Sequence, residues 1–378
     1  MAFFGKECPY LCQRQNPPTA LSTPTFYHLI TMPMPAENPF ARNLMRRSRL
    51  LAGLLLAAAC LSGTLMGLQR PLKSIGSDPV NGSMVTGDTN RVKLWTAPAE
   101  STLRGLPAPE RTLIRYGREL IAHTANYLGP KGSVAHLSNG MNCQNCHLKA
   151  GTQPWGNNYA AVQATYPKFR ERSGTVENQI KRVNDCFQRS LNGRPLDSAS
   201  REMQAILAYI KWLGTDLPPG QVPRGSGIFK LKGLDRPADT ARGLAVYTQK
   251  CQSCHQPNGA GNLALGSKSY TYPPLWGEHS YNQGAGLFRL SNLAGYVRYN
   301  MPLGATYESP QLTDEEAWDV AAYINSQPRP TGNISRDWPN LAGKPFDHPF
   351  GPYTDPFSEQ QHKYGPFDPI KNWKAAHK

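Results

Sequence analysis

The 378-residue sequence predicts a mainly α-helical protein made of two similar domains in tandem. Three observations support this prediction. The length corresponds to two domains plus additional segments at roughly 150 residues per domain, a short cysteine motif occurs twice, and apolar residues recur at helical spacing on both sides of each copy. With 39% hydrophobic and 18% charged residues, the chain is too apolar to be disordered and too polar to span a membrane many times.

The amino-terminal part of the sequence has the pattern of a targeting segment. Residues 1–44 are Pro-rich and aperiodic, so we treat them as a disordered or mis-annotated leader, whereas residues 45–68 begin with clustered arginines and continue into an apolar run. Charged residues followed by an apolar run are typical of an export signal. A cleaved signal peptide, a lipid anchor on Cys60 and an uncleaved membrane span over residues 50–68 all agree with this pattern. We therefore expect a periplasmic protein whose membrane attachment, if present, is through residues 50–68, with residues 69–100 as a linker.

Two copies of the pattern CxxCH begin 108 residues apart. In this pattern two thiols lie one helical turn apart, so each can form a thioether with a haem vinyl group while the adjacent histidine ligates the iron. One copy alone could be a redox dithiol or half of a zinc site, but two copies in an exported chain without another CxxC pair argue against zinc and against a disulfide framework. We expect two covalently bound haem c groups, attached at Cys143, Cys146, Cys251 and Cys254, with His147 and His255 as iron ligands.

Helical spacing surrounds both motifs. In the first half, apolar residues recur every three or four positions over 110–128, before the motif, and over 200–213, after it. In the second half, a shorter helical stretch over 240–250 precedes the motif, and Thr313 forms a capping box with Glu316 at the start of a later helix. Each half therefore has the order helix, CxxCH, long loop, helix. This is the plan of a class I cytochrome c domain, in which two terminal helices cross and the loop wraps the haem.

A Pro/Gly-rich stretch over 218–227 separates the two halves. We place the boundary near residue 226, which gives a first domain over 101–226 and a second domain over 227–330. The remaining residues, 331–378, are rich in Pro, Asp and aromatic residues and show no helical period, so we expect an irregular tail that packs on the domains.

A second axial ligand, or its absence, sets the potential and chemistry of each haem. In the second half, Met301 lies 46 residues after His255 on a turn before the last helix, which predicts a His/Met haem of relatively high potential. Ordinary core packing is the alternative for a methionine before a proline. The first half has no equivalent residue, because Met203 lies in a helical stripe and Met141 immediately precedes the motif.

Cys186 is the only cysteine of the two predicted domains outside the motifs. An unpaired thiol in an exported protein is either inert core filling or a reactive or ligating group. Flanking arginines favour the thiolate, which is a strong iron ligand. We therefore interpret Cys186 as the second ligand of the first haem or as a reactive sulfur, with His123 and His136 as competing ligands.

The chain carries a formal net charge of +15, and its basic residues are dense around Cys186. A basic surface for docking an acidic electron acceptor is one interpretation of this density. For Arg172 and Arg182 we favour binding of a small dianion, because guanidinium groups match oxyanions in bidentate fashion. Nucleic-acid binding is disfavoured because the cluster lacks stacking aromatic residues and because an exported protein does not share a compartment with DNA or RNA.

With these features, the sequence resembles the dihaem thiosulfate dehydrogenases that form tetrathionate. The similarity runs from about Gly117 to the end of the chain. The segments that carry it are Asn142 to His147, Arg170 to Gly174, Arg182 to Cys186, Arg189 to Gly193, Trp276-Gly277, Ser280 to Asn282, Asn300 to Pro302 and Gln361 to Pro366.

The resemblance implies roles for individual residues. The first haem would be catalytic, with His147 and Cys186 as iron ligands, and Arg172, Arg182 and Ser190 would line the substrate pocket. The second haem, with His255 and Met301, would pass electrons outward. Some family members have a lysine before the distal methionine, but Asn300 occupies that position here, which argues against a ligand switch.

The expected activity is oxidation of two thiosulfates to tetrathionate, with two electrons leaving through the haems to a small soluble cytochrome c or a similar acceptor. The same groups could also reduce tetrathionate. The main alternative is a non-catalytic dihaem electron carrier for a respiratory complex. A dihaem peroxidase needs an open iron, which a Cys186 ligand would block, and a subunit of the Sox-type cytochromes would need a partner chain.

Overall fold

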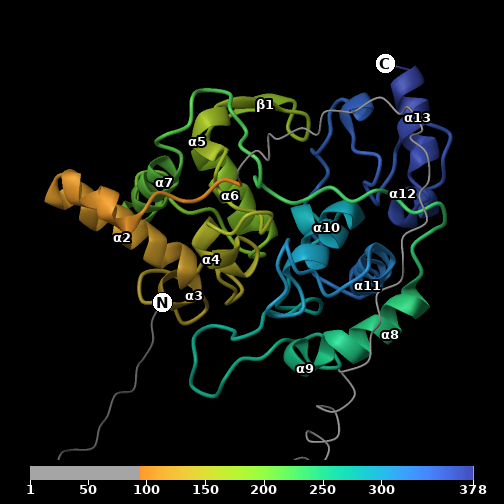
Figure 1. The fold of residues 1–378 in the computed structure, drawn as a ribbon, viewed down its shortest axis with the longest axis horizontal. Helices are drawn as coiled ribbons and strands as arrows, with labels where there is room; N and C mark the ends of the chain where they lie inside the picture. Colours follow the sequence, from red (N-terminus) through yellow and green to blue (C-terminus); the bar gives the residue numbers. More distant parts are fainter. Residues whose placement is uncertain (1–93, 378) are drawn as a thin grey trace, which may run out of the picture. The chain divides into compact units, whose positions relative to one another are not determined.

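The computed structural model describes residues 94–377 (Figure 1). The predicted leader over 1–44, the export signal over 45–68 and most of the predicted linker lie outside these residues. Within the described part, no helix is both long enough and apolar enough to cross a bilayer. Helices dominate the structure, as the sequence predicts, and the only named strands of this part form one short hairpin.

The first half of the described chain contains two longer helices that cross. Its elements are the 3-10 helix η1 (Glu100–Gly105), α2 (Ala108–Ala122), α3 (Thr124–Leu128), η2 (Cys143–Asn145), α4 (Leu148–Gly151), α5 (Val162–Thr165), β1 (Lys168–Arg170), β2 (Thr175–Glu177), α6 (Gln179–Arg189) and α7 (Arg201–Leu213). Helix α2 crosses α7 at Gly117, where a Cβ atom would overlap the carbonyl oxygen of Ala205. Glycine therefore sets how closely these two helices approach.

The sequence predicts one helix over 110–128, but the structure breaks it at His123. The break has a physical cause. The Ala125 amide donates to Asn142 Oδ1 (2.9 Å), and the Thr124 hydroxyl accepts from the Cys143 amide (2.9 Å). Through these bonds, the first residues of α3 hold Asn142 and Cys143 at the start of the first CxxCH motif, and the helix breaks just before them.

The second half repeats the crossing. Its elements are α8 (Thr240–Lys250), α9 (Gln252–His255), η3 (Gly286–Phe288), α10 (Leu290–Asn300) and α11 (Asp314–Ser326). Helix α8 crosses α11 at Gly243, where a Cβ atom would overlap the carbonyl oxygen of Asp319. The predicted capping box begins α11, since Thr313 Oγ1 accepts from the Glu316 amide (3.1 Å) and Glu316 Oε2 from the Thr313 amide (2.8 Å).

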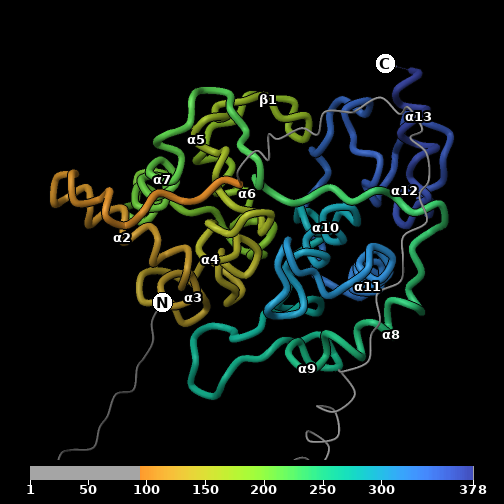
Figure 2. Tube along the Cα trace, in the orientation of Figure 1, coloured from red at the N-terminus to blue at the C-terminus, as the bar shows by residue number. Residues whose placement is uncertain are grey.

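Two apolar cores lie mainly in the two halves, although the first also includes Tyr281, Ala285 and Phe288 of the second half. The first is built around α2 and α7, and the second around α8, α10 and α11. Figure 2 traces the connection between α7 and α8 as it passes from one half to the other. This connection is bonded to the first half, because Gly225 and Gly227 accept hydrogen bonds from the Trp155 and Asn157 amides (both 2.8 Å).

The hairpin positions basic residues next to α6. Strands β1 and β2 pair antiparallel, with Lys168 opposite Glu177 and Arg170 opposite Thr175. Arg172 lies in the turn between them, and α6 begins two residues after β2. Asn178 caps α6 by accepting from the Lys181 amide (2.9 Å).

The prediction of an irregular tail over 331–378 is wrong in part. This segment contains the 3-10 helix η4 (Leu341–Gly343) and the helices α12 (Glu359–Tyr364) and α13 (Asp368–Ala376). Phe367 and Ile370 are buried in the second core, so the tail is anchored by apolar packing. Short helices of this kind depend on tertiary contacts, which explains why the sequence carries no clear period there.

Candidate active site

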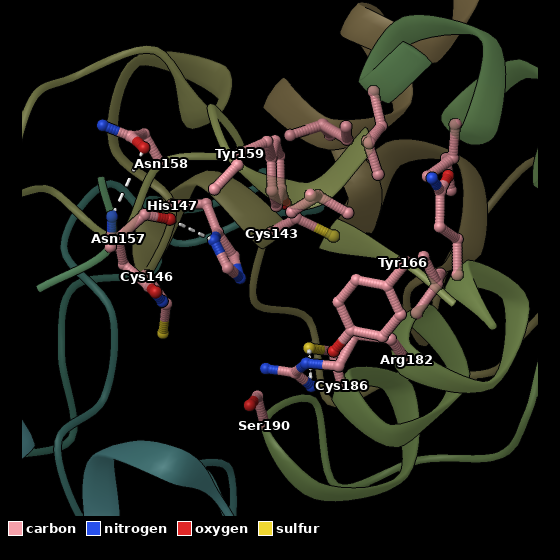
Figure 3. A pocket seen from close by; sticks show the side chains of 18 of the residues that line it. Cys143, Cys146, His147, Asn157, Asn158, Tyr159, Tyr166, Arg182, Cys186 and Ser190 are labelled. Carbon is pink, nitrogen blue, oxygen red and sulfur yellow. Dashed lines mark hydrogen bonds between the residues drawn. The ribbon is translucent and has the colours of Figure 1, made fainter. Parts of the chain in front are cut away.

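A cavity of about 380 Å³ lies in the first half, and we call it the first cavity (Figure 3). Its wall includes Cys143, Cys146 and His147 of the first motif, and Cys186 and Arg182 of α6. Figure 3 shows the His147 ring entering from one side and Cys186 facing it from the other. Most of the remaining wall is apolar, from Ile121, Val162, Phe187, Ile206 and Ile210 among others.

Local hydrogen bonds orient His147. Its Nδ1 lies 2.5 Å from the carbonyl oxygen of Asn157, so Nδ1 carries the proton and Nε2 is left as an acceptor. Burial lowers the pKa of His147 to about 4, which keeps the ring neutral at physiological pH. A neutral imidazole with its Nδ1–H bonded to a carbonyl is the form that ligates iron.

The two thiols of the first motif are protonated at neutral pH. Desolvation raises the pKa of Cys143 to about 11 and that of Cys146 to about 12. Two unbonded thiols, one neutral imidazole and an apolar wall around a cavity are the groups that a c-type haem requires. The residues of the first cavity therefore fit a haem c.

The second half repeats the histidine arrangement. His255 is 8% exposed, and its Nδ1 lies 2.8 Å from the carbonyl oxygen of Pro273. Burial lowers the pKa of His255 and raises that of Cys251 to about 11. Met301, at the C-terminal end of α10, and Cys251 both pack against the second core. The two cysteines and the buried histidine of this half also fit a haem c.

Cys186 and Arg182 lie one turn apart on α6 and contact each other. Arg182 Nη1 donates to Cys186 Sγ at 3.2 Å. The negative charge of the Cys186 sulfur raises the pKa of Arg182 further above its ordinary value. The guanidinium therefore places a cationic donor directly on the Cys186 sulfur.

A second cavity of about 150 Å³ adjoins the first, and we call it the arginine cavity. It is lined by Arg170, Arg172, Arg182, Arg189, Arg289 and Trp338, with two carboxylates, Glu177 and Asp185. Both carboxylates are paired with Lys181, at 3.6 Å and 2.5 Å. Five arginines and Lys181 therefore outnumber the carboxylates of Glu177 and Asp185 around a small space, and this excess of positive charge suits an anion.

The arginines of this cavity are held in different ways. Arg189 forms a bidentate pair with Asp337 (2.7 and 2.8 Å), and Arg289 contacts the buried Asp347. Arg172 donates to the carbonyl oxygen of Gly284 (2.9 Å). Burial and the neighbouring Arg189 lower the pKa of Arg172 to about 10, so it stays charged at neutral pH.

The structure brings most of the predicted site residues together. Ser190 and Arg182 line both cavities, Cys186 lines the first and Arg172 the arginine cavity. The competing ligands His123 and His136 are exposed and line neither cavity. His255 is the last residue of α9, and Met301 directly follows α10, so both lie in the second half.

Sequence reasoning did not single out Arg289 and Trp338 as site residues. Arg289 precedes α10 and Trp338 lies in the tail, more than 100 residues from Cys186 in the sequence. Neither belongs to a recognisable motif, so no sequence signal could have placed them beside Cys186. Arg170 and Arg189 belong to segments that carry the family resemblance, but the sequence assigned them no individual role.

Comparisons with known proteins agree with this architecture. A family model described as "SoxA/TsdA, cytochrome c domain" matches residues 133–218, and one described as "Cytochrome c" matches residues 240–328. The thiosulfate dehydrogenase of Allochromatium vinosum is 39% identical over 233 residues, which are 60% of this chain and 84% of the relative. That of Stutzerimonas stutzeri is 36% identical over 218 residues, 58% of this chain and 68% of the relative.

A solved structure is also similar. The thiosulfate dehydrogenase from Marichromatium purpuratum superimposes with a TM-score of 0.58 at 30% identity. The match covers 73% of this chain and 54% of the solved chain, so our protein spans about half the length of that one.

The two helix crossings, the two CxxCH motifs and the paired histidines define a dihaem cytochrome c. The chain belongs to the SoxA/TsdA family of these cytochromes, which contains relatives named thiosulfate dehydrogenase. The resemblance seen in the sequence is thereby confirmed, and the two cytochrome c domains imply haem c as the cofactor.

Proposed function

We propose that this protein is a thiosulfate dehydrogenase that joins two thiosulfate ions into tetrathionate. Two electrons leave through two haem c groups, one bound covalently at Cys143 and Cys146 and the other at Cys251 and Cys254. His147 and Cys186 would ligate the first iron, and His255 and Met301 the second. Names of relatives at 35% to 39% identity support the substrate.

One observation carries the proposal: the contact of 3.2 Å between Arg182 Nη1 and Cys186 Sγ, beside a cavity lined by five arginines. Two thiosulfate dianions repel each other, so a site that joins them must first neutralise their charge. Arg172 and Arg182 supply cationic forks that match sulfonate oxygens. Ser190 lines both cavities and adds a hydroxyl to this site.

The bond-making steps use the sulfur of Cys186. In the first step, the terminal sulfur of one thiosulfate bonds to Cys186 Sγ, and two electrons leave. In the second step, the terminal sulfur of another thiosulfate attacks the sulfur bound to Cys186, which forms tetrathionate and releases the Cys186 thiolate. Arg182 stabilises this leaving thiolate because its guanidinium already donates to the sulfur.

The haems, when bound, supply the one-electron acceptors that this two-electron oxidation requires. Everything else is done by the chain, which binds the anions, neutralises them and presents the sulfur. The same groups serve the reverse reaction, reduction of tetrathionate. We propose that the electrons pass to a small soluble cytochrome c or a similar acceptor outside the cytoplasm, in keeping with the export pattern over 45–68.

The test is anaerobic oxidation of thiosulfate by the purified holoprotein, with ferricyanide as electron acceptor. Ferricyanide reduction and tetrathionate are measured in the same sample. We expect two electrons and one tetrathionate for every two thiosulfates consumed. A holoprotein with both haems intact that changes neither quantity would instead be an electron carrier, and its arginines a docking surface.

A further inference from the structure

Two residues that line the arginine cavity each carry a buried donor that has no acceptor among the described residues. These are Nε of Arg172 and Nε1 of Trp338. Trp338 is 8% exposed, and the nearest carboxylate to Arg172 Nε, that of Asp337, is 4.0 Å away. A buried N–H group without an acceptor is costly and calls for an explanation.

Arg172 and Trp338 line the same small cavity as Arg182 and Arg189, and Trp338 also lines a cavity formed by the tail. An anion in the arginine cavity would supply the missing acceptors, because each of its oxygens can accept several hydrogen bonds. Arg172 and Trp338 are also directly joined: the Trp338 amide donates to the Arg172 carbonyl oxygen (2.7 Å), and the Arg172 guanidinium lies 5.7 Å from the indole ring. The two orphaned donors therefore form one local unit.

The backbone at Trp338 is strained. Its φ angle is +61°, a left-handed conformation that bulky residues rarely adopt. The indole also packs edge-on against His348, with ring centroids 5.7 Å apart. Strain of this kind persists only where the surroundings hold the residue. Trp155 has a similar φ angle of +58°, so the strain indicates a held side chain and does not by itself indicate a ligand. The fold thus holds a large side chain in place at the wall of the arginine cavity.

We propose that Trp338 is a substrate-binding residue whose indole N–H, together with the Nε–H of Arg172, donates hydrogen bonds to the sulfonate oxygens of thiosulfate. This inference rests on the proposed function and deepens it. Arg182, which lines both cavities and contacts Cys186, connects this anion position with the reactive sulfur. Trp338 lies beyond both matched family regions, 133–218 and 240–328, so neither match assigns it a role.

The variant Trp338→Phe tests the inference, because it keeps an aromatic ring against Arg172 and His348 and removes only the N–H donor and part of the ring. Thiosulfate binding is measured by calorimetry on electrochemically reduced holoprotein, in which oxidation cannot proceed. We expect Kd to rise about tenfold, the size of one hydrogen bond to an anion. In the oxidation assay, the KM for thiosulfate should rise by a similar factor while kcat stays near the wild-type value.

Trp155→Phe is the matched control. Trp155 Nε1 is equally buried and unpartnered, but Trp155 packs against Phe229 and lines neither cavity. Removing the indole N–H of Trp155 should leave Kd and KM for thiosulfate unchanged. An equal rise of Kd in both variants would mean that any buried indole donor has this effect, and it would overturn the inference.

A second measurement uses the wild-type protein, so it does not depend on whether a variant folds. The chain has seven tryptophans, whose indole N–H resonances can be followed in protein labelled with ¹⁵N-tryptophan. Thiosulfate should shift the Trp338 indole resonance and leave that of Trp155 in place. If no indole resonance moves at saturating thiosulfate, the inference is wrong.

The experiments distinguish a failure of the proposed function from a failure of the proposed role of Trp338. A wild-type protein that forms tetrathionate, with a Trp338→Phe variant of unchanged Kd and KM, would retain the proposed function and refute the role of Trp338. A wild-type protein that forms no tetrathionate but binds thiosulfate about ten times more tightly than Trp338→Phe would refute the function and support the anion site.

Discussion

Cys186 and Arg182 are four residues apart on α6, so helix geometry alone brings their side chains to the same face. In the proposed reaction, this contact of 3.2 Å lets the Arg182 guanidinium stabilise the negative charge that forms on the sulfur when it leaves. The chemistry proposed here therefore depends on two positions of one short helix.

Cys186→Ala should abolish thiosulfate oxidation and leave both haems attached, because neither attachment motif contains Cys186. Turnover is measured with ferricyanide, and haem content by the pyridine haemochrome spectrum. Wild-type rates in this variant would show that no covalent adduct forms on Cys186.

Arg182→Lys should lower kcat/KM by about tenfold or more, although the charge is kept, because an ammonium group cannot donate as a planar fork to both sulfur and sulfonate. Arg194→Lys serves as the control, since Arg194 is exposed and only donates to the carbonyl oxygen of His136 (3.1 Å). Equal effects of the two substitutions would argue against a specific role for Arg182.

His348 makes stability depend on pH. Burial, together with the nearby charges of Lys344, Arg172 and Arg289, lowers the pKa of His348 to about 4. The unfolded chain takes up this proton near pH 6.5, so it binds more protons than the folded chain between pH 6.5 and 4. Acidification through this window should therefore remove up to about 3 kcal/mol of stability.

The variant His348→Asn keeps a short polar side chain but cannot titrate in this range. Guanidinium unfolding of the holoproteins at pH 7 and pH 5 should show a smaller loss of stability for the variant than for the wild type. The same loss in both proteins would mean that other groups cause the pH dependence.

At the scale of elements, each half depends on one glycine at its helix crossing. Gly117 lets α2 approach α7, and Gly243 lets α8 approach α11, because any Cβ there would overlap backbone of the facing helix. Main-chain atoms of a packed helix cannot move aside as a flexible side chain does, so the crossing angle and distance are fixed at these positions.

Gly243→Ala should lower the free energy of unfolding by about 3 kcal/mol or more, because the added methyl group forces the helices apart. Gly105→Ala is the control, since a Cβ at Gly105 meets no atom within 4 Å. Thermal unfolding of both variants measures the difference. A Gly243→Ala protein as stable as the control would show that the helices separate without cost.

Elements with long apolar stripes could be predicted from the sequence. Helices α7, α8 and α11 begin close to the predicted residues, because stripes and caps report on local packing. The break at His123 could not be predicted, since its cause, the bond from Ala125 to Asn142, joins separate segments. The tail helices were missed because α13 buries only Ile370 and so has no stripe.

The site divides in the same way. The CxxCH motifs are short local patterns, and Cys186 stands out because it is the one cysteine of the two domains outside them, so both could be found from the sequence. Arg172 and Arg182 were inferred from charge density and from the family resemblance. Arg289 and Trp338 reach the arginine cavity only through the packing of distant segments, which single-sequence patterns do not describe.

At the scale of the whole molecule, Asn300 joins the two halves. Its Oδ1 accepts from Gln153 Nε2 (2.7 Å) and its Nδ2 donates to the carbonyl oxygen of Trp155 (3.2 Å). Tyr296, on the same helix, donates to the carbonyl oxygen of Asn145 inside the first motif (2.9 Å). Helix α10 therefore holds the first motif and the loop that follows it against the second half.

Asn300→Ala should lower the free energy of unfolding by about 1 to 3 kcal/mol, because it leaves buried partners in both halves without their bonds. Asn333→Ala is the control, since Asn333 is exposed and bonds only to Ser335. Denaturant unfolding of the holoproteins measures both effects. Equal stability of the two variants would show that the halves are not coupled through Asn300.

The tail that supplies Asp337 and Trp338 is needed for the arginine cavity but not for haem attachment, which gives the protein its colour. A chain that stopped at residue 330 would still encode both attachment motifs, both glycine crossings and Met301, and a preparation that folded would be red. It would lack one wall of the arginine cavity and the partner of Arg189. The red colour that usually indicates a well-made cytochrome would then report nothing about whether the proposed anion site is complete.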